Sequence, residues 1–346
     1  MSTLSDSRPL TAPTRAIRPR GPWATAFAKL GRDRGAMAAL AILVTIVFAC
    51  LLAPFYATQV SHSDPFSSNL SGEITLDGAS VPVMQSETEG LGIGFTPIGP
   101  TWRAAYLLGA DGQGRDVAAR LLYGGRNSLV ISAAATLLCL SLAALLGVTA
   151  GFFGGLVDTL LNGLFDLLWA FPVYLLAISL SIITISSGLS FGPITIRADS
   201  LWLPIVIIGI IYLPYVARPI RGQVLGLTRS DFVLAAIGLG VPSRRILFRD
   251  ILPNVMTTLV VFAPLMMALN MLTESALSFL SIGVQAPDAS WGTVIQDGQA
   301  LLYTRPIVAI APGLCIMITV MALNVLGDGV RDALDPRARI RLGRRR

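Results

Sequence analysis

The chain has 346 residues, of which 53% are hydrophobic and only 13% are charged, and its net charge is +6. Soluble globular proteins carry roughly 25% charged residues, so this composition excludes an ordinary water-soluble domain. The single histidine, His62, and the single lysine, Lys29, also exclude a two-histidine metal helix and a G-x-x-x-x-G-K-[ST] phosphate loop, so we expect neither an enzyme nor a cofactor.

The chain begins with a basic segment, residues 1–35, whose first 22 residues are rich in Ser, Pro, Thr and Arg. Six charge-free stretches follow. Most are about as long as the roughly 20 apolar residues that a helix needs to cross a bilayer. The sequence therefore predicts an all-α, polytopic membrane protein with about six transmembrane helices, beginning with a retained anchor at 36–56. The six stretches are residues 36–63, 127–157, 167–196, 200–217, 251–273 and 306–327.

The distribution of Lys and Arg predicts the orientation, because these residues concentrate in short cytoplasmic segments. Most of them lie before residue 35, in the segment 218–250, or in the basic C-terminal tail, 329–346. Both termini and the segment 218–250 are therefore expected in the cytoplasm. The positive charge then follows from topology and attraction to anionic membrane lipid, and it does not predict a nucleic-acid partner. The remaining basic residues lie in the predicted outer loops. They are Arg103, Arg115, Arg120, Arg126, Arg197 and Arg305.

Between the first two spans, residues 57–126 form an extracytoplasmic loop. The piece "EITLDGASVPV" (73–83) has alternating apolar residues and a turn signal, which predict a small lobe with short strands. The piece "GRDVAARLLYGGRNS" (114–128) predicts an amphipathic segment leading into the second span, with Arg115, Asp116 and Arg120 mostly off its apolar face.

The remaining five spans form a permease-like core at 127–328. Gly147, Gly151 and Gly155 are spaced four apart, which predicts close helix–helix packing in the membrane. Two acids fall in or beside apolar stretches: Asp166 in the third span, which extends backward from residue 167 to about 159, and Glu274 near the outer end of the fifth. Acids inside a membrane are functional candidates, and the structural alternative is a carboxylate paired with a neighbouring helix or subunit, or a position at an interface or a loop anchor for Glu274.

The segment 218–250 contains an Arg-bearing polar stretch between two apolar runs. Thr228 and Asp231 predict a capping box at the start of a first short helix. Gly238, Gly240 and Pro242 end that helix, and Ser243 is expected to cap a second one before Pro253. This pattern predicts two short helices at the membrane surface that offer small residues to another protein, and the alternative is an amphipathic loop lying on lipid.

The sequence "LAAIGLGVPSRRILFRDILPN" (234–254) resembles the E-A-A-x-x-x-G-x(9)-I-x-L-P loop of ABC importer permeases. Ala235, Ala236, Gly240 and Pro253 match that pattern. The leading glutamate of the pattern is Leu234 here, although Asp231 lies about one turn earlier. The isoleucine position is occupied by Asp250.

Four further segments resemble the second, C-type permease of dipeptide, oligopeptide and nickel importers, although the outer loop 57–108 is enlarged. They are "RDRGAMAALAILVTIVFACLLAPFY" (32–56), "GADGQGRDVAARLLYGGRNSL" (109–129), "ESALSFLSIGVQAPDASWGTVIQDG" (274–298) and "NVLGDGVRDALDPR" (324–337).

This resemblance implies a permease subunit in a bacterial inner membrane that pairs with a homologous permease as a heterodimer. It also implies two cytoplasmic ATPase subunits, an extracytoplasmic solute-binding protein, and alternating access driven by ATP. Peptides are the implied substrate class, with nickel chelates and other small solutes left open. The residues expected to couple to the ATPases are Asp231, Ala235, Ala236, Gly240, Arg244, Arg245 and Pro253.

Two alternatives remain at this stage. A stand-alone secondary transporter or channel would drive flux without companion chains. A non-transporting membrane assembly factor would show no substrate-stimulated ATPase activity in its complex.

Overall fold

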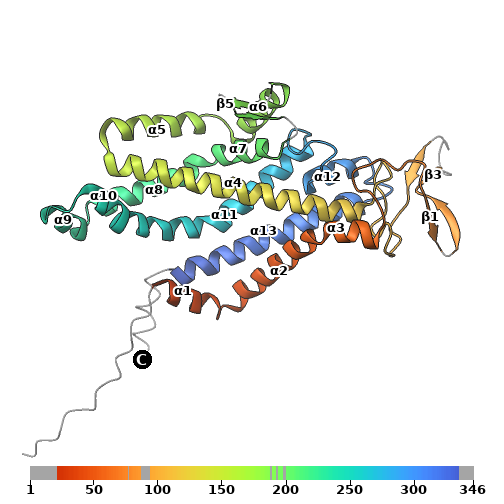
Figure 1. Ribbon diagram of the computed structural model, residues 1–346, viewed down its shortest axis with the longest axis horizontal. Coiled ribbons are helices and arrows are strands. Elements are labelled where there is room, and N and C mark those ends of the chain that lie inside the picture. The colour runs from red at the N-terminus through yellow and green to blue at the C-terminus, as the bar shows by residue number, and fades with distance from the viewer. Residues whose placement is uncertain are drawn as a thin grey trace, which may run out of the picture.

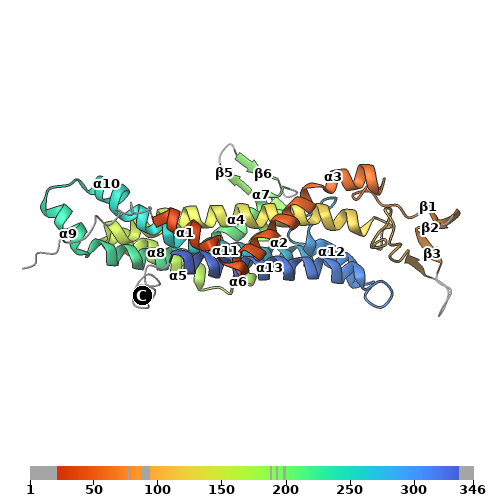
Figure 2. The same cartoon turned by 90° about the horizontal axis from the view of Figure 1, so that it is seen from below.

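The computed structural model describes residues 22–334, apart from 77, 87–93, 188, 192, 193, 198 and 199. Most helices run along the long axis of the molecule, and a small lobe of strands lies at one end (Figure 1). The view turned by 90° again shows this lobe and helix α9 at opposite ends (Figure 2). The predicted all-α membrane fold is confirmed. Most of the two predicted basic tails, residues 1–21 and 335–346, lies outside the described residues.

Within the described residues, four helices are long and apolar enough to cross a membrane, and the number rises to six if each of two bent pairs is one span. The bent pairs are α5 (Gly155–Trp169) with α6 (Val173–Ser187), at 88°, and α7 (Trp202–Ile211) with α8 (Leu213–Thr228), at 44°. The four long helices are α2 (Arg34–Leu51), α4 (Val117–Phe153), the continuous helix Ser243–Phe279, and α13 (Ile307–Leu334).

Prolines lie at both bends. Pro172 sits between α5 and α6, and Pro214 is at the start of α8. A proline has no backbone N–H and its ring clashes with the preceding turn, so a helix kinks or breaks there. Each bend therefore has a proline beside it in the sequence, although hydropathy alone would predict a single span across each bent pair.

The long helix at 243–279 is built from α10 (Ser243–Ile246), a π-helical turn (Leu247–Ile251) and α11 (Leu252–Phe279). Shorter elements connect the spans. They are α1 (Pro22–Leu30), α3 (Ala53–Phe55), another π-helical turn (Tyr56–Val60), α9 (Asp231–Gly238) and α12 (Trp291–Gln299).

The lobe contains two antiparallel hairpins, and only the first lies within the predicted piece at 73–83. In the first hairpin Ile74 faces Val81. A small core of Val83, Ile98 and Tyr106 holds the lobe together. The strands are β1 (Glu73–Leu76), β2 (Ala79–Pro82), β3 (Met84–Ser86) and β4 (Phe95–Pro97), and a separate hairpin comprises β5 (Leu189–Phe191) and β6 (Ile194–Ile196).

Helix α4 is the centre of the bundle, and its closest neighbour is α8. A Cβ atom placed on Gly147 would lie 2.7 Å from the Ala217 carbonyl oxygen, and one on Gly151 would lie 2.8 Å from the Arg221 carbonyl oxygen. Small residues allow such close backbone approach inside a membrane. Gly155 does not belong to this row, because it has φ +55°, follows the α4–α5 turn, and has no neighbour within 4 Å of a Cβ position.

Replacing Gly151 by Ala tests this contact. The added methyl group would lie 2.8 Å from both the Arg221 carbonyl oxygen and Val224 Cβ, so Gly151→Ala is expected to destabilise the protein by about 1–3 kcal/mol. Gly163→Ala is the matched control, since open space surrounds Gly163 in α5 and alanine is the better helix former. Thermal unfolding in detergent measures both, and equal midpoints would contradict the packing.

Candidate functional site

Helix α9 follows α8 after a two-residue break, at the end of the molecule opposite the strands (Figure 1). The predicted capping box is wrong. Thr228 is the last residue of α8, and its hydroxyl donates to the Leu225 carbonyl. Ser230 is the N-cap residue of α9, but its hydroxyl donates back to the Leu227 carbonyl. Side chains at this corner therefore complete the last turn of α8 instead of capping α9.

Gly240 ends α9 through two backbone hydrogen bonds. The Val241 amide donates to the Ala236 carbonyl (3.0 Å), and the Gly240 amide donates to the Ile237 carbonyl (2.9 Å). This pair of bonds is a Schellman motif, which requires a left-handed residue at the position of Gly240. Gly240 has φ +75°, which only glycine adopts without strain. The glycine of the resemblance motif therefore fixes the direction in which the chain leaves α9.

The predicted second short helix is not a separate element. Helix α10 starts at Ser243, whose side chain makes no cap hydrogen bond, and it continues through the π-helical turn into α11. The Leu252 amide donates to the Leu247 carbonyl, five residues back. This wider turn directly precedes Pro253, which lacks an amide donor, so the helix continues past a residue that was expected to end it.

The segment from Ser230 to Ile246, here called the α9 elbow, has a buried side and an exposed side. Val233 and Ile246 are buried in the same core cluster as Val224 and Val255, which attaches the elbow to α8 and α11. On the outside, Leu239 is 83% exposed, and Ala235 is exposed as well. The other exposed large or charged side chains of the elbow are Asp231, Phe232, Leu234, Ile237, Arg244 and Arg245. Such a surface offers apolar contacts beside positive charge, which suits protein docking and offers no catalytic group.

Two ion pairs join α5 to α8. Asp166 accepts a hydrogen bond from Arg218 at 2.6 Å, and the Arg218 guanidinium lies 4.5 Å from the centre of the Trp169 ring. Asp158, which the sequence analysis did not select, binds Arg221 through both carboxylate oxygens. The structure thus places Asp166 in a pair with a neighbouring helix, which was the structural alternative for this acid.

Glu274 is fully buried inside α11 and is surrounded by hydroxyl groups. Its carboxylate accepts from Ser278 Oγ (2.8 Å) and Ser275 Oγ (3.3 Å), and the hydroxyl groups of Ser128 and Ser290 also interact with it. Ser128 belongs to α4 and Ser290 is the N-cap of α12, so Glu274 lies where three helices meet. Glu274 is therefore internal to the bundle, at an interface between helices.

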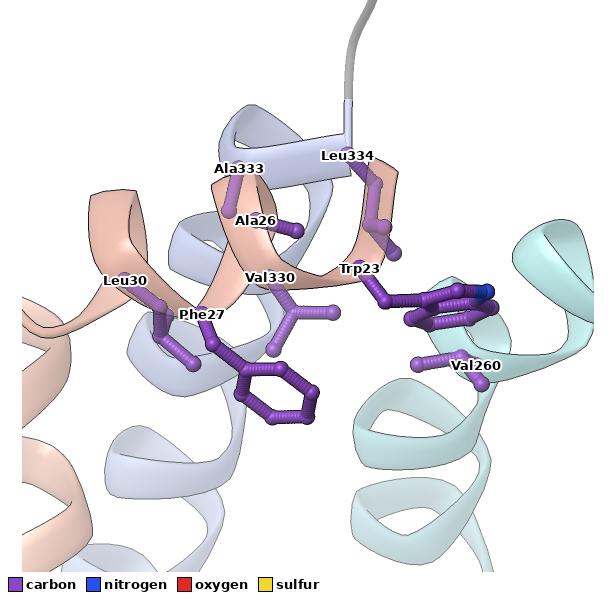
Figure 3. Close-up of a pocket in the computed structure, with 8 residues that line it drawn as sticks. All are labelled: Trp23, Ala26, Phe27, Leu30, Val260, Val330, Ala333 and Leu334. Carbon is purple, nitrogen blue, oxygen red and sulfur yellow. The ribbon is translucent and has the colours of Figure 1, made fainter. Parts of the chain in front are cut away.

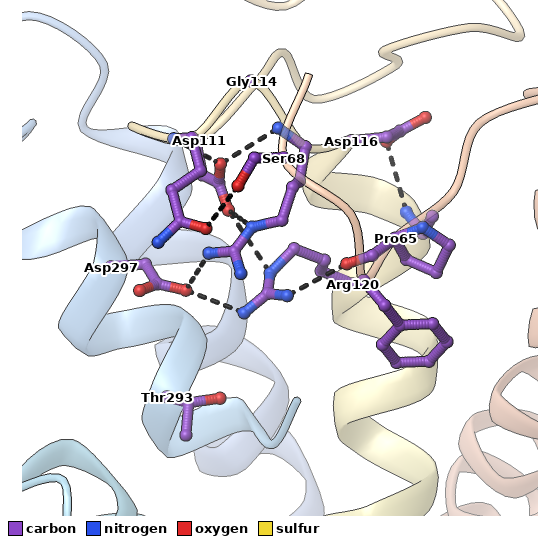
Figure 4. A network of polar contacts seen from close by, with 12 residues as sticks. Pro65, Ser68, Asp111, Gly114, Asp116, Arg120, Thr293 and Asp297 are labelled. Carbon is purple, nitrogen blue, oxygen red and sulfur yellow. Dashed lines mark hydrogen bonds and ion pairs between the residues drawn. The ribbon is translucent and has the colours of Figure 1, made fainter. Parts of the chain in front are cut away.

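A buried network of charges lies where the lobe meets α4 (Figure 4). Arg115 binds Asp111 (2.7 Å) and Asp297 (2.9 Å). Arg120 binds the same Asp297 (2.8 Å) and donates to the Pro65 carbonyl (3.0 Å). The network therefore links the lobe to the start of α4 and to α12.

Sequence reasoning missed this network. Arg115, Asp116 and Arg120 were expected mostly off the apolar face, but they are 5%, 0% and 2% exposed. Asp116 caps α4 by accepting from the Ala118 amide (2.8 Å), and burial raises the pKa of its carboxyl despite these hydrogen bonds. Of the two carboxylates that the arginines share, Asp111 is four residues from Arg115, whereas Asp297 is 182 residues away. The contact with Asp297 could not be read from the local sequence.

Comparisons with known proteins agree over most of the chain. Residues 143–340 match the family model described as "Binding-protein-dependent transport system inner membrane component", and residues 21–71 match "N-terminal TM domain of oligopeptide transport permease C". The dipeptide transport system permease protein DppC of Alkalihalophilus pseudofirmus is 31% identical over 316 residues, which are 91% of this chain and 90% of that protein. The oligopeptide transport system permease protein OppC of Bacillus subtilis is 34% identical over 317 residues, covering 92% and 90%.

A solved structure has the same fold over a shorter range. A chain of the MetNI methionine ABC transporter, in an inward-facing conformation, superposes with a TM-score of 0.50 at 15% identity. The match covers 62% of this chain and 96% of that one. It supports the fold of the helical core.

Replacing Asp111 by Asn tests the charge network. Asp111 is 1% exposed, and its loss would leave two buried arginines to share Asp297. Breaking a buried pair costs about 3–5 kcal/mol, so the unfolding midpoint is expected to fall by about 6 °C or more. Asp64→Asn, at an exposed acid of the same lobe, is the control and is expected to change little. If both variants melt alike, the network does not hold the lobe.

Proposed function

This chain belongs to the family of binding-protein-dependent transport system inner membrane components, and from that premise we propose that it forms half of the translocation path of a bacterial peptide importer. It is a multi-pass membrane permease and not an enzyme, and permeases of this family work with an ATPase on separate subunits. The proposal concerns how this chain couples to those subunits and what it carries.

The α9 elbow is the proposed docking site for a cytoplasmic ATPase subunit, and its geometry is the observation that carries this proposal. Exposed apolar residues, such as Leu239 and Phe232, cover its outer side, whereas Val233 fixes its inner side to the bundle. Arg244 and Arg245 lie exposed on α10 beside them, and Asp231 begins α9. A protein that gripped the outer side would therefore pull on α8 and α11 together.

Alternating access is the proposed mechanism. Binding of ATP to the companion ATPases would move the α9 elbow as a rigid body, and the motion would pass along α8 to the bend at Leu213. The 44° bend between α7 and α8 and the 88° bend between α5 and α6 are candidate hinges, because helices change direction there without long loops. ATP can drive the change only to the extent that it favours one conformation over the other in free energy.

Peptides are the proposed substrate class. The relatives include permeases named for dipeptide, oligopeptide and glutathione transport. We propose that the second half of the path is a homologous permease, giving a heterodimer, and that an extracytoplasmic solute-binding protein delivers the peptide on the side of the β1–β4 lobe. A second ATPase subunit would then bind the partner permease.

We also propose that the protein lies in the plasma (inner) membrane with the α9 elbow and both termini in the cytoplasm. The support is the concentration of Lys and Arg in those three regions of the sequence. The first and last described helices support this orientation, since α1 and the end of α13 lie toward the α9 end of the bundle (Figures 1 and 2).

Replacing Ala235 by Arg tests the docking site. Ala235 is exposed, so the variant should fold, but a long charged side chain on the outer side of α9 would block close approach of a partner. We expect ATPase subunits to stop co-purifying with the chain and peptide uptake by cells to fall at least tenfold. Ala28→Arg, at an exposed position of α1, is the control for expression and insertion.

Either of two results would refute this assignment. One is normal co-purification and uptake with Ala235→Arg. The other is labelling of Ala235→Cys in intact cells by a thiol reagent that does not cross the membrane, because that would place the α9 elbow outside. Cys50 and Cys139 are buried, and replacing the three native cysteines by alanine removes their background.

A further inference from the structure

An apolar crevice lies between α1, α11 and the end of α13 (Figure 3). Its volume is about 70 Å³, far below the roughly 300–1,000 Å³ of a site for a small-molecule ligand. The lining residues have hydrocarbon or aromatic side chains, so the crevice can hold a stretch of hydrocarbon and offers almost nothing to a polar molecule. They are Trp23, Ala26, Phe27, Leu30, Val260, Val330, Ala333 and Leu334.

The wall formed by α1 has the character of a helix at a membrane surface. Ala26 is buried against the bundle, whereas Phe27 is 69% exposed and Trp23 is 41% exposed. Close packing holds α13 against this corner, since a Cβ atom on Gly329 would lie 3.3 Å from Leu30 Cδ1. Trp residues gather at the boundary between hydrocarbon and headgroups. Trp23 therefore gives the crevice a residue of the type found where acyl chains end and polar groups begin.

Basic residues are concentrated in the two ends of the sequence that join the described chain here. Residues 1–34 carry a net charge of +5 and residues 328–346 carry +4, whereas the whole chain carries only +6. Among described residues, Arg32, Arg34 and Arg331 are exposed and Lys29 is half-buried. The acids nearby are Asp328, Asp332 and Asp33, and Asp33 Oδ1 accepts from the Gly35 and Ala36 amides. Both basic ends of the sequence join the described chain at this crevice, through α1 and Leu334.

We propose that this crevice is a binding site for an anionic phospholipid, with one acyl chain between α1 and α13 and the phosphate beside Lys29 and Arg32. The shape of the crevice accounts for the acyl chain, and the nearby Lys and Arg residues account for the anionic headgroup, which they attract. The lipid would fasten α1 to the end of α13, next to the helix α11 that continues from the α9 elbow.

Native mass spectrometry of the delipidated full-length chain, with equimolar phosphatidylglycerol and phosphatidylcholine, tests the site. Phosphatidylglycerol is expected to remain bound at least fivefold more often. Ala333→Phe fills the crevice and should remove this preference, whereas Ala28→Phe, which adds the same bulk at an exposed position outside the crevice, should keep it. Equal retention of both lipids by the native chain, or an unchanged preference in Ala333→Phe, would overturn the proposal.

A second variant keeps the test decisive if Ala333→Phe fails to fold. Replacing Lys29 and Arg32 together by Gln leaves the crevice intact and removes two charges. The retention of phosphatidylglycerol should fall about fivefold or more, while that of phosphatidylcholine stays constant. A double variant that still prefers phosphatidylglycerol to the native extent would contradict the assignment of the headgroup to these residues.

Discussion

The close contact between α4 and α8 is the constraint on which the rest of the structure depends. Inside hydrocarbon, no hydrophobic effect drives helices together, so packing must hold them. Gly147 and Gly151 let the backbone of α4 approach that of α8. At its far end α8 leads into the α9 elbow, and α4 begins at the network of Arg115 and Arg120 beneath the lobe. One pair of packed helices thus connects the two ends of the molecule.

This arrangement explains how a permease without a nucleotide site of its own can respond to a separate ATPase. A force on the α9 elbow reaches α8 and α11 through buried residues such as Val233 and Ile246, and it reaches α4 through the glycine contact. Asp158 and Asp166 of α5 bind arginines of α8, so α5 follows α8 as well. The family match favours a permease subunit over a stand-alone transporter or an assembly factor.

The sequence allowed the membrane class, the approximate spans, the first hairpin of the lobe and the position of the α9 elbow to be predicted, because each depends on local composition or periodicity. The sequence pattern misled where the outcome depends on residues far away in the chain. Arg115 and Arg120 were expected mostly off the apolar face of their segment, but they are buried with Asp297, and Glu274 lies buried beside Ser128 and Ser290. Local geometry also overrode local signals: the π-helical turn carried a helix past Pro253, and a turn separated Gly155 from the packing row.

The central claim is that the α9 elbow, α8 and α4 move as one body. The most direct measurement is the distance between spin labels at exposed Ser243, in the α9 elbow but not among its docking residues, and at exposed Leu145 in α4, in the assembled complex with and without ATP. The account predicts the same distance in both states while ATP still supports uptake. A nucleotide-dependent change larger than the spread of the labels would show that the α9 elbow moves separately from α4, and the account would be wrong.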